Sequence, residues 1–349
     1  MPLNPSGAIS LAGPVAGQSI AVELGQSATA TISLNDTNVR TLAQKPTGVI
    51  VMPTDFWGKS NVTGTQRVIF GFGRSPVQTN IINLVSNTGV VAADTPGAGT
   101  ARSSLAAAGY GGDKAIFGFG ATPINTNVTN LVSNTGVVAS DTPGANTARS
   151  SLAAAGYGGD KAIFGYGGTP TITSITSLVS NTGVIAADTP GVGTARFVLA
   201  AAGYGGDKAI FGFGATPSPV TRRNMTNLVS NTGVVASDTP GVGSIRSNLA
   251  ATSYGGDKAM FSFGQPAHVT NLVSNTGVVA TNTPAVGSPR LNLAAAVYGG
   301  DKAIFGYGDT FGPVSSITNL VSNTGVVATD TPGVGTARTA LGAASYSLT

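Results

Sequence analysis

The sequence predicts an all-β protein whose larger part is a six-bladed β-propeller. Two observations carry that prediction. A unit of about 47 residues returns along the chain, and each end of the repeated region holds only part of one unit. The composition, with 50 glycines and 9% charged residues, suits short strands and tight turns better than long helices. The propeller spans residues 66–349, after a distinct N-terminal segment, residues 1–65.

Three short phrases mark the repeat. NLVSNTGVVA or a close variant begins at Asn83, Asn130, Ser177, Asn227, Asn271 and Asn319, at spacings of 47, 47, 50, 44 and 48 residues. IFGFG or a variant begins at Ile69, Ile116, Ile163, Ile210, Met260 and Ile304. An arginine opens the third phrase at Arg102, Arg149, Arg196, Arg246, Arg290 and Arg338. A period of roughly 40–50 residues is typical of propeller blades.

Each unit predicts four short strands, here called A to D. In the second unit, strand A is SSLAAAGY (103–110) and, after a GGD turn, strand B is KAIFGFG (114–120). A loop of changing length leads to strand C, TNLVSN (129–134), and a TG turn leads to strand D, VVAS (137–140). The DTPG sequence that follows is strong turn chemistry, because aspartate caps its own backbone and proline fixes φ. Four strands per unit make one blade.

The two ends of the repeated region predict a closed ring. The first unit starts at strand B, QRVIFGFG (66–73), and the last stops after strand A, ARTALGAASY (337–346). Together the fragments complete one blade if the C-terminal strand pairs with the N-terminal blade, which removes both free sheet edges.

Strand B predicts how neighbouring blades pack. Strict alternation puts Ala115, Phe117 and Phe119 on one face, and Ile116 with two glycines on the other. Bulky rings on one face and glycines on the other let blades nest closely.

The repeats resemble kelch repeats, in which an arginine precedes a small-residue strand and a Y-F-G-G-like strand follows. The resemblance covers residues 66–346, with GFG or GYG in place of the expected glycine doublet and without the expected tryptophan of the fourth strand. It implies a kelch-like β-propeller.

The N-terminal segment, residues 1–65, contains no copy of the repeat. Its phrases GAISL, ATISLNDTNVRTLA and TGVIVMPTDFWGKS resemble the N-terminal segment of tailed-bacteriophage virion proteins. The resemblance implies a tail or fibre component, with this segment as the attachment element. From the residues themselves we expect a helix near 36–43, capped by Asn35 or Asp36. For Trp57 we expect a packing role, with contact to a sugar ring as the alternative.

Composition argues against several functions. The chain has no cysteine, one histidine (His268) and one glutamate (Glu23), a poor supply for acid–base catalysis. We therefore expect no enzyme, no cofactor and no metal site. Net charge is +4 and only Arg222 and Arg223 are adjacent cations, so we expect no nucleic-acid binding. Neither a membrane span nor a signal peptide is expected.

The B–C loops are the predicted binding surface. Propeller geometry puts the B–C and D–A connections on one face and the A–B and C–D turns on the other. The B–C loops vary in length and composition while the frame stays constant, and loops on a rigid scaffold commonly carry binding. Neutral drift explains such variation equally well. The candidate binding residues are Arg74, Asn125, Thr171, Arg222, Arg223, His268 and Phe311.

Repeated charged residues have two interpretations each. The aspartates of the DTP turns (Asp94, Asp141, Asp188, Asp238, Asp330, with Asn282 in the remaining unit) favour Asx-type turns over a metal-binding ring. The repeated arginines favour structural pairing over an anion channel. Asp113 and Lys114 are adjacent, so strand alternation predicts that they do not pair. His268 is expected to face solvent.

The leading hypothesis is a phage virion structural protein in a tail or fibre. It is expected to form homo-oligomers, to contact other tail or baseplate proteins through residues 1–65, and to present its loops to a host glycan or a virion protein. Synthesis in the host cytoplasm is expected. The alternative is a soluble lectin-like propeller without a virion role. A propeller glycosidase is disfavoured because it needs a suitably spaced carboxylate pair.

Overall fold

The structure is a computed structural model that describes residues 9–11, 19–24, 27, 32–34, 36–43, 49–52, 65–217 and 219–347. The chain divides into two compact units, Met1–Thr63 and Gly64–Thr349.

Unit 1 contains two short helices, α1 (Ile20–Glu23) and α2 (Thr37–Leu42). The helix predicted near 36–43 is confirmed. The Asp36 carbonyl accepts its first backbone hydrogen bond, from Arg40 N at 2.9 Å, while Ser33 N donates to Asp36 Oδ2 at 2.7 Å. Val39 and Leu42 belong to a small buried apolar cluster. Asn35, Trp57 and most of the phrases behind the phage resemblance lie outside the described residues.

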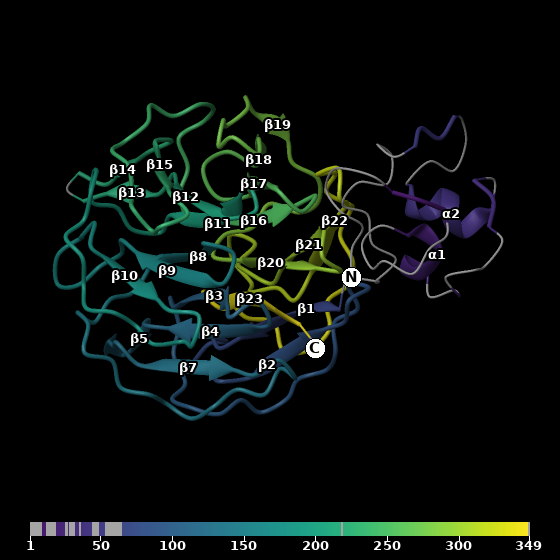
Figure 1. The fold of residues 1–349 in the computed structure, drawn as a ribbon. Helices are drawn as coiled ribbons and strands as arrows, with labels where there is room; N and C mark the ends of the chain where they lie inside the picture. The colour runs from purple at the N-terminus through teal and green to yellow at the C-terminus, as the bar shows by residue number, and fades with distance from the viewer. Residues whose placement is uncertain are drawn as a thin grey trace. The chain divides into compact units, whose positions relative to one another are not determined.

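Unit 2 consists of small antiparallel sheets, so the all-β prediction is confirmed (Figure 1). In the described part of the chain, the larger sheets have the orders β2-β1-β23, β3-β4-β7, β8-β9-β10, β11-β12-β15, β16-β17-β18-β19 and β20-β21-β22, and two-stranded sheets join β5 to β6 and β13 to β14.

The central strands, which correspond to strand B, are β1 (Gln66–Gly71), β4 (Lys114–Gly118), β9 (Lys161–Gly165), β12 (Lys208–Gly212), β17 (Lys258–Ser262) and β21 (Lys302–Gly306). The strands corresponding to A are β3 (Ala106–Tyr110), β8 (Ala153–Tyr157), β11 (Ala200–Tyr204), β16 (Ala250–Tyr254), β20 (Ala294–Tyr298) and β23 (Gly342–Ser347). Those corresponding to C are β2 (Ile82–Val85), β7 (Thr129–Val132), β10 (Thr176–Val179), β15 (Thr226–Val229), β18 (Val269–Val273) and β22 (Thr318–Val321). The remaining strands are β5 (Ala121–Thr122), β6 (Ile124–Asn125), β13 (Ala215–Thr216), β14 (Thr221–Arg222) and β19 (Thr283–Pro284).

The C-terminal strand pairs with the first strand of unit 2, as predicted. The ladder between β1 and β23 runs from Gln66↔Ser347 to Gly71↔Gly342. The A strands lie at the centre of unit 2 (Figure 1), and each contacts the next along the chain, while β23 also contacts β3.

Backbone hydrogen bonds link the A strands at both ends in closed cycles. At the start of each strand, the N–H of Ser104 donates to Ala340 O at 2.8 Å, and the same bond recurs from sheet to sheet. The donor and acceptor residues of that cycle are Ser104, Ala340, Asn292, Asn248, Val198 and Ser151, returning to Ser104. At the other end, Gly111 N donates to Asp160 O at 2.7 Å and Ser347 N to Asp113 O at 2.8 Å. The six sheets therefore hold one another at both ends of their A strands.

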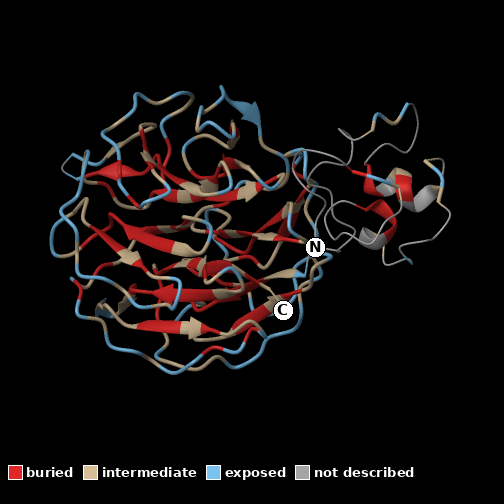
Figure 2. Ribbon diagram, viewed as in Figure 1, coloured by how far each residue is buried: buried red, intermediate tan, exposed pale blue. Residues whose placement is uncertain are grey.

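Neighbouring sheets pack through the predicted contact, in which a phenylalanine ring of one sheet lies against a glycine of the next. A Cβ added at Gly71 would lie 2.8 Å from Cζ of Phe117, and one at Gly306 would lie 2.8 Å from Cζ of Phe70. Phe117 also meets Phe72 edge to face, with ring centroids 5.1 Å apart. Each fully buried phenylalanine contributes roughly 1.5–3 kcal/mol. Buried residues concentrate on the sheets of unit 2 (Figure 2), so the core is distributed among the interfaces between sheets.

Two details of the predicted strands are wrong. Phe119 does not share a face with Phe117. Its φ is +62°, which ends the alternation, and its ring packs 5.2 Å from Phe164, on the opposite side from Phe72. Strand B therefore ends at Gly118.

Strand D is reduced to isolated bridges such as Val85↔Val91. A second contact with strand C, such as Ile82↔Thr95, lies in the turn sequence that follows, and β19 lies at the same position. Between those two bridges, the Asn83 amide donates to Ala92 O at 3.0 Å. A side chain thus takes a place that a backbone N–H would have in a regular ladder.

Candidate functional site

The variable B–C loops are anchored beside the segments that lead into the A strands. Ser103 bridges to Ala121, and Leu291 bridges to Asp309. The B–C loops and the D–A connections therefore meet at one end of the sheets. We call this end of unit 2 the loop face.

Buried arginines support the loop face from beneath. Arg102 is fully buried and donates from Nε to Phe119 O at 2.8 Å and from Nη2 to Asn130 Oδ1 at 2.6 Å. Its guanidinium lies 4.3 Å from the ring centroid of Phe72. Five counterparts are equally buried, each over an aromatic ring: Arg149, Arg196, Arg246, Arg290 and Arg338. The structural interpretation, pairing with the nearby aspartate or with loop carbonyls, is confirmed for Arg102, Arg149, Arg196, Arg290 and Arg338.

The repeated aspartates clasp neighbouring sheets together. Asp141 Oδ2 accepts a hydrogen bond from Thr100 N at 3.0 Å, and Asp141 Oδ1 accepts one from Asn130 Nδ2 at 2.9 Å. Arg102 Nη1 lies 3.8 Å from Asp141 Oδ1. Partial burial raises the pKa of Asp141, but these hydrogen bonds and Arg102 together lower it below its usual range. The Asx-turn interpretation is wrong, because the carboxylate binds a loop 41 residues earlier in the chain.

The same kind of aspartate contact, which we call the clasp, also links the first and last repeats of unit 2. Thr336 N and Oγ1 both donate to Asp94 Oδ2, at 2.9 and 2.6 Å.

Four of the predicted binding residues lie in separate B–C loops. Arg74 is exposed and its backbone pairs with that of Thr339. Asn125 Nδ2 donates to Gly168 O at 2.8 Å and so ties its loop to the next sheet. Thr171 is exposed, as is Phe311, which is 59% accessible.

The other three, Arg222, Arg223 and His268, lie in the B–C loops of two adjacent sheets. Arg222 Nε donates to Ser247 Oγ at 3.3 Å, and the Arg223 backbone pairs with that of Arg246. His268 is half-buried and stacks on Phe263, with ring centroids 5.1 Å apart. The expectation that His268 faces solvent is wrong. Burial first, and then nearby Arg290, lower the pKa of His268 below its ordinary value.

A small depression of about 90 Å³, which we call the axial depression, opens among the starts of the six A strands. One leucine next to each of the six larger sheets lines it: Leu105, Leu152, Leu199, Leu249, Leu293 and Leu341. Its other lining residues are Ser104, Ser151, Val198, Asn248, Asn292 and Ala340, all with positive φ. None of the predicted binding residues lines this depression.

One side of the depression carries a polar network that the sequence did not predict. Asn248 Nδ2 donates to Asn292 Oδ1 at 2.6 Å. Asn248 Oδ1 accepts from Ser247 Oγ at 3.0 Å and from Gln265 Nε2 at 3.3 Å. Ser247 in turn contacts Arg222, so the network reaches a variable loop. The sequence does contain a signal for this network. The residue two positions after each repeated arginine varies from unit to unit, and it is asparagine at 248 and 292.

The tight A–B turns lie at the opposite end of the A strands, and here the non-pairing prediction is wrong. Lys114 Nζ lies 2.6 Å from Asp113 Oδ1, and Lys161 Nζ lies 2.8 Å from Asp160 Oδ1. The aspartates sit in the turn rather than in the strand, so alternation does not separate the two side chains.

No group of three or more His, Asp or Glu side chains in the described ranges is arranged to hold a metal ion. Neither described helix has the length and apolar content needed to cross a membrane. No protein-family model matches the chain, and no curated protein matches it.

Proposed function

We propose that unit 2 is a closed six-bladed β-propeller and that the chain is a structural component of a phage tail or fibre. Support for closure comes from the β1–β23 ladder and from the two cycles of backbone hydrogen bonds. The Asp94–Thr336 clasp adds a side-chain link between the same two ends. The phage assignment rests on the phrases of residues 1–65, and kelch-like character rests on the repeated arginine and glycine phrases.

In this proposal residues 1–65 attach the chain to other tail or baseplate proteins, and the loop face binds a host-surface glycan or a virion protein. One observation carries the binding role. The buried arginine over an aromatic ring recurs in all six larger sheets, while the loops and the rim of the axial depression differ from sheet to sheet. Binding residues are commonly carried by variable loops on such a frame. The role is one of binding and assembly rather than catalysis.

Immunogold electron microscopy of purified virions tests the virion role. An antibody against the full-length chain is expected to label the tail of intact particles, and mass spectrometry of those particles is expected to detect the chain. A chain that appears in the infected-cell lysate and is absent from purified virions would overturn the assignment. The soluble lectin-like propeller would then be the better account.

Competition for adsorption tests the binding role. Excess full-length protein is expected to slow adsorption of the phage to its host, and Asn292→Ala combined with Arg222→Ala is expected to weaken that competition. A control substitution at Val137, an exposed side chain of a C–D turn, should leave it unchanged. Equal competition by all three proteins would exclude a binding role for these loop-face residues.

A further inference from the structure

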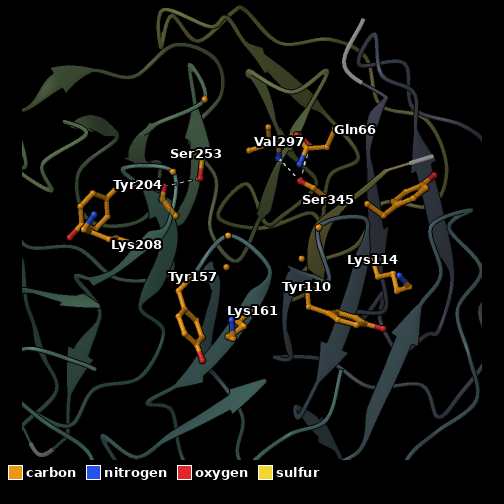
Figure 3. Close-up of a pocket in the computed structure, with 18 residues that line it drawn as sticks. Gln66, Tyr110, Lys114, Tyr157, Lys161, Tyr204, Lys208, Ser253, Val297 and Ser345 are labelled. Atoms are coloured by element: carbon orange, nitrogen blue, oxygen red, sulfur yellow. Dashed lines mark hydrogen bonds between the residues drawn. The ribbon is translucent and has the colours of Figure 1, made fainter. Parts of the chain in front are cut away.

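A second, larger cavity opens on the axis at the A–B turns, away from the loop face. Its volume is about 240 Å³, and residues of all six larger sheets line it. Figure 3 shows that the labelled side chains come from several strands and surround a common opening. The volume is slightly below the roughly 300–1,000 Å³ of pockets that hold drug-sized ligands, so the cavity suits a smaller molecule.

The six larger sheets contribute different residues to the lining of this cavity, although their folds are the same. Three consecutive sheets each contribute a lysine and an axial glycine: Lys114, Lys161 and Lys208, with Gly109, Gly156 and Gly203. The other sheets contribute Ser253, Val297 and Ser345 at the glycine position, and the lysines of their turns, Lys258 and Lys302, do not line the cavity. One half of the cavity therefore carries three lysines and has no side chain at the glycine position.

Among the described residues that line the cavity, the charged ones are all lysines, and none is an aspartate or a glutamate. The Nζ atoms of Lys114, Lys161 and Lys208 each donate to the preceding aspartate, at 2.6, 2.8 and 2.9 Å. These bonds raise the pKa of each lysine, so all three are charged at neutral pH. An ammonium group has three donors, and the aspartate uses one of them.

The glycines are not required by the fold. None of Gly109, Gly156 and Gly203 has a positive φ. A Cβ at Gly156 would meet no atom closer than 3.6 Å, which is ordinary contact, and one at Gly109 or Gly203 would meet none closer than 3.3 Å. Side chains occupy the same position in the other sheets, where Ser345 Oγ donates to Val297 O at 2.7 Å. Glycine inside a strand weakens it, and often marks a place where a ligand approaches the backbone.

We propose that this axial cavity binds a small ligand bearing an oxyanion group, either an inorganic oxyanion or a monosaccharide with a sulfate, phosphate or carboxylate group. The lysine ammonium groups bind the oxyanion as point charges, and the open glycine backbone accommodates the rest of the ligand. The inference does not depend on the virion role, since it rests on unit 2 alone.

Calorimetric and NMR titrations of the full-length chain test the proposal. The probes are sodium sulfate, glucose 6-sulfate, glucose 6-phosphate and glucuronate, with glucose as the neutral control. Binding of at least one oxyanion probe, weakened by added sodium chloride, is expected, and glucose should not bind. If sulfate binds as tightly as the charged sugars, the ligand is an inorganic oxyanion. If a charged sugar binds more tightly than sulfate, the ligand is the sugar.

Matched variants locate the site. Lys161→Met is expected to weaken binding at least about fivefold, and Lys302→Met, in the same turn sequence outside the cavity, less than about twofold. Gly156→Ala is expected to weaken binding while leaving the thermal unfolding midpoint unchanged, since its Cβ has room. Absence of binding by every oxyanion, equal binding of glucose, or equal losses in the two lysine variants would overturn the proposal.

Discussion

Arg246 lacks the carboxylate that its counterparts have, and restoring that carboxylate should stabilise the protein. Asn282 stands where the other repeats have an aspartate. Arg246 is fully buried, and its Nε, Nη1 and Nη2 atoms have no hydrogen-bond partner among the described residues. Burial lowers its pKa to about 10, with no carboxylate to oppose the effect. We therefore predict that Asn282→Asp raises the free energy of unfolding at pH 7.

The local geometry accepts the aspartate without losing a hydrogen bond. Asn282 Oδ1 accepts from Ser244 N at 3.2 Å and from Asn271 Nδ2 at 3.0 Å, and a carboxylate oxygen can do the same. Asn282 Nδ2 donates to Ser244 Oγ at 2.7 Å. With a carboxylate, that hydroxyl turns and donates, as Ser288 does toward Asp330 at 2.6 Å.

The magnitude follows from the intact repeats. Asp238 lies 3.8 Å from Arg196, where two charges attract by about 4 kcal/mol at an effective dielectric constant of about 20, before the cost of desolvation. Partial burial raises the pKa of its counterpart Asp188, but hydrogen bonds from Thr147 and Ser177, and then Arg149, lower it from 3.8 to about 2. Asn282 already accepts two such hydrogen bonds, so the substitution adds mainly the charge attraction. We expect Asn282→Asp to contribute about 1–2 kcal/mol.

Urea unfolding of the full-length chain at several pH values measures the effect. A carboxylate whose pKa is lowered by folding stabilises above its unfolded pKa, near 3.8, and loses that contribution as the pH falls through its folded value. The gain should therefore be complete at pH 7 and decline below about pH 4. Asp238→Asn is the matched control and should lower stability by a similar amount. An Asn282→Asp variant that is no more stable than the original protein at pH 7 would refute the reasoning.

Three further predictions concern packing, backbone and the histidine. Phe117→Ala removes the ring that fills the space beside Gly71 and should lower the free energy of unfolding, measured in urea, by about 3–5 kcal/mol. A loss below about 1 kcal/mol would mean that the neighbouring sheets move together and fill the cavity. Gly120→Ala should cost about 1–3 kcal/mol, because its φ is +100° and the new Cβ would lie 2.8 Å from Ser103 O; unchanged stability would contradict this backbone geometry. His268 has a pKa lowered by folding, so its protonation should reduce stability as the pH falls below about 6.5, and His268→Phe should remove that part of the pH dependence in thermal melts between pH 7 and pH 5; an unaltered pH profile would show that His268 does not titrate in this way.

Of the candidate site, the sequence predicted the surface better than the individual contacts. The variable B–C loops are at the same end as the D–A connections, where Ser103 bridges to Ala121. The contact of Asn248 with Asn292 was not predicted, because those residues are 44 positions apart and meet only when their sheets are adjacent. The pairing of Asp113 with Lys114 was missed because alternation was applied to a residue that lies in a turn.

The sequence alone determined the repeat, the strands A to C, the pairing of the last strand with the first, and the use of glycine opposite phenylalanine. These features follow from periodicity and side-chain size, which are local properties of the chain. Only the tertiary structure decided which face Phe119 occupies and which partner Asp141 binds. A positive φ at a phenylalanine is unfavourable in isolation and persists only because surrounding contacts require it. A carboxylate likewise has many local hydrogen-bond options, and its choice of Thr100 depends on how neighbouring sheets pack.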